Sequence, residues 1–129
     1  MLVIKNYNAG LSGMLNDPEN DLAEYEVKGP LGQSLQVQKS GLHIAFTAGT
    51  GVLPIMDLVL HLLLTTLGLN KSLGVGTGDE VGPDFRLRLY VSHRTRKEAI
   101  ALDLLEAIHE LYKQKEDPSF ELITRISSE

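Results

Sequence analysis

The chain has 129 residues, a formal net charge of −5 and no cysteine. This length fits one domain that buries a core without disulfides, and the lack of cysteine excludes disulfide bonds, thiolate metal sites and thiol nucleophiles. The 12 basic residues form no extended basic face, because only the short groups 86–88 and 94–97 are locally basic. We therefore expect no nucleic-acid partner.

No transmembrane segment is expected. The longest apolar segment, residues 52–64, is interrupted by Pro54, Asp57 and His61 and is shorter than the roughly 20 residues that span a bilayer. It is typical of a buried helix. The N-terminal residues lack the basic region, apolar core and cleavage site of a secretory signal, so an intracellular, by default cytoplasmic, location is expected.

Short elements are predicted before residue 42. Residues 3–7 have the composition of a strand, and a helical turn is expected at 11–15. Residues 23–28 alternate between charged and uncharged side chains, which predicts a half-exposed strand that ends at the Gly-Pro sequence 29–30. Residues 35–38 are a further candidate edge segment.

Residues 42–68 predict a strand, a glycine turn and a helix. The run 42–46 is continuously apolar, as in strands of parallel sheets that are buried on both faces. The turn 49–51 follows, and a helix is expected over 53–67 with Pro54 in its first turn, where the missing N–H is tolerated. Gly68 is the expected stop.

The last part of the chain predicts a strand, a helix and a strand. A glycine-rich loop at 69–84 precedes residues 85–92, which alternate as a strand does. Apolar residues recur at helical spacing over 96–115, and the helix is expected to end before Pro118. Residues 120–126 predict the third strand.

The order strand, helix, strand, helix, strand predicts an α/β domain with a parallel sheet and right-handed crossovers. This is part of a doubly wound, Rossmann-like fold. In such sheets ligands bind beyond the carboxyl ends of the strands, where residues 47–51 and 92–96 both fall. The sequence therefore predicts a ligand site formed by these two segments.

The glycine turn has the residues that hold phosphate. Gly49 and Gly51 allow a ligand close to the main chain, and the N–H groups at the start of the next helix favour an anion. Pro54 stands where the dinucleotide fingerprint has its third glycine, so the match is imperfect. A tight turn without a ligand is the alternative interpretation.

Three segments together resemble the ferredoxin–NADP reductase superfamily, nearest the cytochrome-b5 reductase and nitrate reductase branch. They are residues 25–32 (YEVKGPLG), 43–56 (HIAFTAGTGVLPIM) and 89–95 (LYVSHRT). The resemblance covers most of residues 1–126, and the loop 69–84 is an insertion relative to the family.

The resemblance implies a two-domain flavoenzyme. In that family an antiparallel barrel holds FAD, and an α/β domain delivers hydride from NADH or NADPH, after which electrons pass to a heme protein or another acceptor. Residues 39–129 resemble the NAD(P)-binding domain, incomplete at its C-terminal side. Residues 1–38 would be a linker and a remnant of the flavin-binding barrel, with short antiparallel strands.

The resemblance also implies roles for individual residues around the glycine turn. Gly49, Thr50 and Gly51 would approach the pyrophosphate and the nicotinamide ribose. Pro54 would set the turn against the helix, and Thr47 would face the nicotinamide.

The segment after the second strand would bind the other half of the cofactor. The segment Ser92-His93-Arg94-Thr95 would lie beside the adenosine ribose, with Ser92, Arg94 and Thr95 as candidate contacts, and the guanidinium of Arg94 suits a 2′-phosphate. Ser12 lies in a turn similar to the one that contacts the flavin pyrophosphate. A surface arginine and a turn serine are the alternatives for Arg94 and Ser12.

Several family features have no counterpart in this sequence. The first barrel strands with their flavin motif, the later sheet strands and the Cys-Gly-Pro-like turn near the nicotinamide cannot be assigned. We therefore expect the chain alone to be inactive, with no catalytic residue of its own. A non-catalytic nucleotide-binding or assembly module that keeps the fold is the alternative.

No metal site is predicted. Asp57 and His61 are one helical turn apart, but the sequence suggests no third ligand for them.

Overall fold

The structure is a computed structural model that describes residues 8–20, 24, 26, 28, 35–69, 81–116 and 118–128. The chain divides into two units, Met1–Ser34 and Leu35–Glu129. The two units are described separately below.

The first unit contains one short helix, α1 (Gly10–Leu15), and a 3-10 turn, η1 (Pro18–Asn20). The helical turn expected at 11–15 is confirmed as α1. The strand expected at 3–7 lies outside the described residues. Of the strand expected at 23–28, only residues 24, 26 and 28 are described, and none of them is in a strand. The described residues therefore show no antiparallel barrel strands.

The second unit is an α/β domain with a three-stranded parallel sheet in the order β1-β2-β3. The strands are β1 (Leu42–Ala48), β2 (Arg86–His93) and β3 (Phe120–Ile126). The helices α2 (Leu53–Thr66) and α3 (Leu102–Lys113) alternate with them, which confirms the predicted α/β class and parallel sheet. The 3-10 turns η2 (Gly49–Val52) and η3 (Arg96–Glu98) follow β1 and β2.

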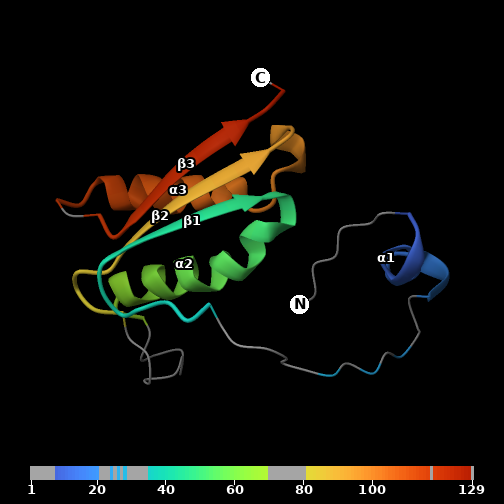
Figure 1. Cartoon of the computed structure of the whole chain (residues 1–129), viewed down its shortest axis with the longest axis horizontal. Coiled ribbons are helices and arrows are strands. Elements are labelled where there is room, and N and C mark those ends of the chain that lie inside the picture. The colour runs from blue at the N-terminus through green and yellow to red at the C-terminus, as the bar shows by residue number, and fades with distance from the viewer. Residues whose placement is uncertain are drawn as a thin grey trace. The chain divides into compact units, whose positions relative to one another are not determined.

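Both helices lie on the same side of the sheet (Figure 1). Alternate residues of β2 point to that side, where Leu87, Leu89 and Val91 are at most 3% exposed. A hydrogen bond of 2.6 Å joins the Tyr112 hydroxyl of α3 to Thr66 Oγ1 of α2. The buried apolar core consists of Val52, Met56, Val59, Leu62, Phe85, Leu87, Leu89, Val91, Leu102, Leu105, Ile108, Tyr112, Phe120 and Leu122.

Neither helix of the second unit, α2 or α3, lies on the opposite face of the sheet (Figure 1). On β1, Leu42, Ile44 and Phe46 are 59%, 52% and 77% exposed. The prediction that this strand is buried on both faces is therefore wrong. Because the strand order advances in one direction from β1 to β3, crossovers of the same hand place both connecting helices on one face.

The ends of α2 agree with the sequence. Pro54 lies in the first turn, as predicted. Gly68 has φ +69°, a left-handed conformation that glycine adopts without strain. The N–H groups of Gly68 and Leu69 bond to the carbonyl oxygens of Thr65 and Leu64, which is a Schellman motif. The predicted stop at Gly68 is confirmed.

The start of α3 differs from the prediction of a helix over 96–115. Thr95 Oγ1 accepts a hydrogen bond from the Glu98 N–H and caps η3, which ends after one turn. Ala101 then has φ +55°, and this left-handed residue separates η3 from α3. The break lets residues 99–101 pack against the core. The edge strand considered at 35–38 is also not formed.

Candidate nucleotide site

The glycine turn begins directly at the carboxyl end of β1. Gly49 has φ +54°, which residues with a side chain rarely adopt. A Cβ placed on Gly49 or on Gly51 would meet no atom within 4 Å. The main chain at both positions is therefore open to a ligand.

The N–H groups of this turn have no side-chain cap. In neither η2 nor α2 does a backbone N–H donate a hydrogen bond to the side chain of the N-cap residue, which is Ala48 or Val52. The first N–H groups of a helix lack partners within the helix and carry the positive end of its dipole. An anion at this point would accept hydrogen bonds from these N–H groups and would be attracted by the positive end of the dipole.

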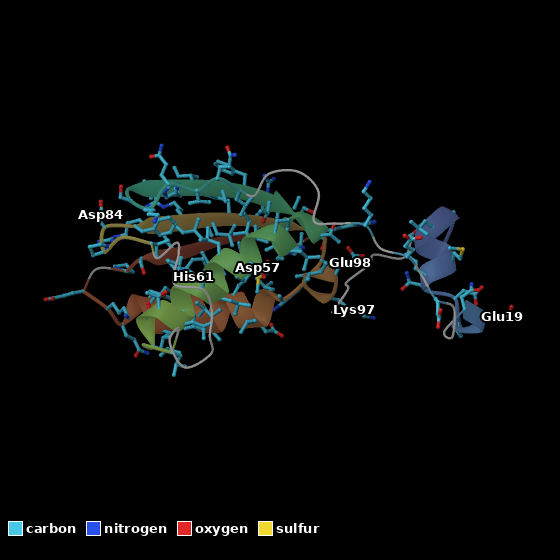
Figure 2. All side chains as sticks on the ribbon, turned by 90° about the horizontal axis from the view of Figure 1, so that it is seen from below. Glu19, Asp57, His61, Asp84, Lys97 and Glu98 are labelled. Carbon is cyan, nitrogen blue, oxygen red and sulfur yellow. The ribbon has the colours of Figure 1, made fainter. Side chains whose placement is uncertain are left out.

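The sheet register brings the second predicted segment to the same edge. Ala48, the last residue of β1, pairs with Ser92 of β2. The glycine turn and residues 92–95 therefore leave neighbouring strands at the same end of the sheet. Lys97 and Glu98 lie at this end, and Asp84, before β2, lies at the other (Figure 2).

Thr47 and Thr95 both have structural hydrogen bonds. The Thr47 hydroxyl donates to the carbonyl oxygen of Tyr90 at 3.2 Å and so joins β1 to β2. Thr95 caps η3, as described above. Either oxygen can also accept a hydrogen bond from a ligand, but the hydroxyl proton of Thr47 is already used.

Arg94 is held by its backbone. Its carbonyl oxygen accepts hydrogen bonds from the Ser128 N–H at 3.1 Å and the Ser128 Oγ at 2.7 Å. Its side chain is exposed, as is that of Lys97. Arg96 differs, because it forms ion pairs with Glu106 and Asp103 of α3. Arg94 and Lys97 are thus exposed cations at this edge, and the exposed Arg125 at the end of β3, which pairs with Ser92, is a further one.

Pro54 and Ser12 complete the set of predicted residues. Pro54 is exposed in the first turn of α2, directly after the glycine turn. Ser12 lies in α1 of the first unit, where its hydroxyl donates to the Ala9 carbonyl oxygen at 3.1 Å. Its contact with a flavin pyrophosphate stays a prediction.

His93 belongs to the predicted segment 92–95, but nothing in the sequence assigned it a role of its own. It is the last residue of β2, its side chain is 5% exposed, and it lies on the helix-covered face. Among the described residues its buried Nε2 atom has no hydrogen-bond partner. Buried polar atoms normally have a partner, so this imidazole nitrogen is an exception within the core. Extending the alternation of the strand by one residue would have placed His93 inside.

A hollow lies on the opposite face of the sheet near the same edge. The rings of Phe46 and Tyr90 are stacked there, with centroids 4.7 Å apart and planes 19° apart. Ser92, Ile123 and Arg125 complete its lining, together with Thr47 and Val91. The sequence analysis did not identify this hollow, because it depends on which side chains of three strands share a face.

Asp57 and His61, the pair considered as metal ligands, both lie on α2 (Figure 2). Asp57 is exposed, whereas the Nε2 atom of His61 is buried without a partner in the described part of the chain. Within that part, no three histidine, aspartate or glutamate side chains are grouped as metal ligands.

One described segment, Gly49–Thr66, is apolar and long enough by composition to cross a membrane, with a mean hydropathy of 1.5. Four of its residues, Val52, Met56, Val59 and Leu62, belong to the core under the sheet. In this structure 28% of the segment is buried, and one side of it packs in the core of the α/β domain.

No protein-family model matches this chain, and the searches of curated proteins and of solved structures gave no match. The resemblance to ferredoxin–NADP reductases therefore depends on the sequence motifs alone.

Proposed function

We propose that this chain is the NAD(P)H-binding part of an intracellular flavin-dependent oxidoreductase. One observation supports the proposal most: an uncapped glycine turn with open space at both glycines lies beside Ser92 at the carboxyl edge of a parallel sheet. This is where α/β sheets bind nucleotides.

In this proposal the residues of the chain bind and orient the dinucleotide. The N–H groups after Gly49 receive the pyrophosphate, and Thr50 and Gly51 lie against the nicotinamide ribose. The Arg94 side chain approaches the adenosine ribose or its 2′-phosphate. Hydride transfer to FAD in a flavin domain, and electron transfer to a heme protein or another acceptor, are the chemistry of the cofactors.

A second candidate function is a non-catalytic nucleotide-binding or assembly module. The exposed apolar residues Leu42, Ile44 and Phe46 support it, because they are typical of a surface that another polypeptide covers.

The substitution Gly51→Val tests the phosphate position. Gly51 does not have a left-handed φ and a Cβ there meets nothing within 4 Å, so valine fits the turn without backbone strain. Its side chain would nevertheless occupy the space through which the phosphate approaches. We expect NADH and NADPH to bind at least about tenfold more weakly, about 1.4 kcal/mol, in calorimetric titrations.

The matched control is Asp57→Asn, on the exposed side of α2. It should leave both affinities unchanged, and circular dichroism should show all three proteins folded. The proposal fails if the unmodified chain binds neither nucleotide at millimolar concentration. If Gly51→Val binds normally, the phosphate is elsewhere.

Arg94→Ala should weaken NADPH binding more than NADH binding if Arg94 contacts the 2′-phosphate.

A further inference from the structure

We propose that His109 is a pH-sensitive link that holds helix α3 to strand β3 at neutral pH and loses its hold in acid. The link is one hydrogen bond, in which the Leu122 N–H donates to the Nδ1 atom of the His109 imidazole at 3.2 Å. We call it the His109–Leu122 bond. This inference does not depend on nucleotide binding.

The His109–Leu122 bond lies on the edge of β3 that faces away from β2. On the other edge, the Leu87 N–H donates to the Ser119 carbonyl oxygen, and the Ser127 N–H donates to the His93 carbonyl oxygen. In a parallel ladder every second residue of a strand bonds to the same neighbour, so the odd-numbered residues of β3 face β2. The N–H of Leu122 therefore points away from β2, and His109 supplies the acceptor for it.

The bond requires a ring nitrogen without a proton. A backbone N–H only donates, so Nδ1 accepts through its lone pair, and the proton of the neutral imidazole is on Nε2. In the imidazolium both nitrogens carry a proton, and no rotation of the ring restores an acceptor. The His109–Leu122 bond is therefore present while the ring is neutral and is lost as the pH falls and the ring takes up its second proton.

Loss of this bond leaves a donor without its partner in a buried residue. Leu122 is 8% exposed, and an N–H that has lost its acceptor in such a place costs free energy. The His109 ring packs edge-to-face on the buried Phe120, with centroids 6.3 Å apart. His109 itself is only half-buried, so protons from the solvent reach the ring. Protonation therefore weakens the contact between α3 and β3.

The charged groups around His109 are mostly paired with one another. They are Glu106 with Arg96 and Glu110 with Lys113 on α3, Glu121 with Arg88 on the sheet, and, after α3, Lys115 over the Tyr112 ring and the exposed Glu116. Lys113 lowers the pKa of the Glu110 carboxyl by a hydrogen bond and by its charge, and the charge of His109 contributes less. The carboxylates of α3 closest to His109 in the sequence therefore already have cationic partners.

His43 makes the opposite kind of hydrogen bond. Its Nε2 atom lies 3.1 Å from the carbonyl oxygen of Ser40. A carbonyl oxygen only accepts, so the imidazole is the donor, and the protonated ring donates as well. This bond persists in acid, which makes His43 a matched control for His109.

His61 and His93 require that the test be local. Each has a buried Nε2 atom without a hydrogen-bond partner in the described part of the chain. Acid therefore acts on these two side chains as well, and the overall stability of the domain would not separate their contributions from that of His109.

Hydrogen exchange of single amides, followed by NMR on the full chain, is a local measurement. The protection of the Leu122 amide, corrected for the exchange rate of an unstructured peptide, is compared with that of the Ala45 amide in β1 from about pH 8 to about pH 5. We expect the protection of Leu122 to fall at least about fivefold relative to Ala45, the effect of one hydrogen bond. The midpoint should coincide with that of the ring-proton resonances of His109.

Two substitutions of His109 separate the acceptor from the titrating ring. His109→Asn places an amide oxygen near the position of Nδ1, so Leu122 should keep its protection relative to Ala45 in acid. His109→Phe keeps a ring without an acceptor, so this protection should be low at every pH. His43→Asn should show the full pH response of the unmodified chain, and circular dichroism shows whether each variant is folded.

Two results would overturn the proposal. Leu122 and Ala45 could lose protection in parallel as His109 is protonated, which would mean that Leu122 exchanges only when the whole domain unfolds. A pH response that persists in His109→Asn would mean that another group is responsible. The unmodified chain and His43→Asn decide the first of these results even if a substitution of His109 prevents folding.

Discussion

Successive residues of each strand point to opposite faces of the sheet, and the two faces differ in how far their side chains are exposed. On the helix-covered face Leu89 is fully buried, whereas on the opposite face Phe46 is 77% exposed. Both residues belong to short segments with the apolar composition of strands. The comparison shows that the core of the second unit is built on the helix-covered face of its sheet.

The largest expected effect is that of Leu89→Ala. The side chain is completely buried in the central strand, so its removal leaves a cavity between the sheet and the helices. Such changes destabilise a domain by about 2 to 5 kcal/mol. Urea denaturation followed by circular dichroism measures this loss.

Ile44→Ala is the matched change on the side of the sheet that faces away from α2 and α3. Ile44 is 52% exposed, and its substitution should alter the free energy of unfolding of the monomer by no more than about 0.5 kcal/mol. Urea denaturation followed by circular dichroism measures this change under the same conditions as for Leu89→Ala. Equal losses in Leu89→Ala and Ile44→Ala would show that both faces are packed and would remove the distinction between them.

A smaller effect is expected from Tyr112→Phe. This change keeps the buried ring but removes the hydroxyl that bonds to Thr66 and joins α3 to α2. The loss should be about 0.5 to 1.5 kcal/mol, the net value of one hydrogen bond. Thermal unfolding compared with the unmodified chain tests it, and an unchanged midpoint would mean that the helices are held by apolar contacts alone.

The smallest effect concerns Glu110 on the solvent side of α3. The Lys113 ammonium, 2.7 Å away, lowers the pKa of the Glu110 carboxyl by hydrogen bonding and by its charge. A lowered pKa in the folded state stabilises the fold at neutral pH, and this contribution disappears as the pH falls through that pKa. Glu110→Gln should therefore show a slightly weaker dependence of the unfolding free energy on acid pH.

Local patterns predicted most of the second unit. The alternation of residues 85–92 and the composition of 120–126 gave β2 and β3 almost to the residue. Gly68 and Pro54 marked the ends of α2 because their backbone constraints are local. The apolar run of β1 predicted a strand but not its exposure, since exposure depends on which side both crossover helices take.

The start of α3 was missed for a related reason. Residues 96–101 have the polar and apolar spacing of a helix, but the Thr95 cap and the left-handed Ala101 place a break there. The spacing of apolar residues along the sequence does not show such a break in the helix. At the candidate site, the adjacency of the two segments followed from strand order. Other features of the site could not be predicted from the sequence, because they depend on which side chains meet in the folded domain. They are the hydrogen bond of Thr47, the ion pairs of Arg96 and the burial of His93.

The parallel register also has a consequence for how the domain forms. Leu42 pairs with Arg86, and Leu87 pairs with Phe120, so each strand pair closes only after a long stretch of chain has been brought together. Closing such loops costs entropy before the contacts form, which slows folding. The β2–β3 connection is the shorter of the two. We therefore expect β2, α3 and β3 to assemble first and β1, with its glycine turn, to join them last.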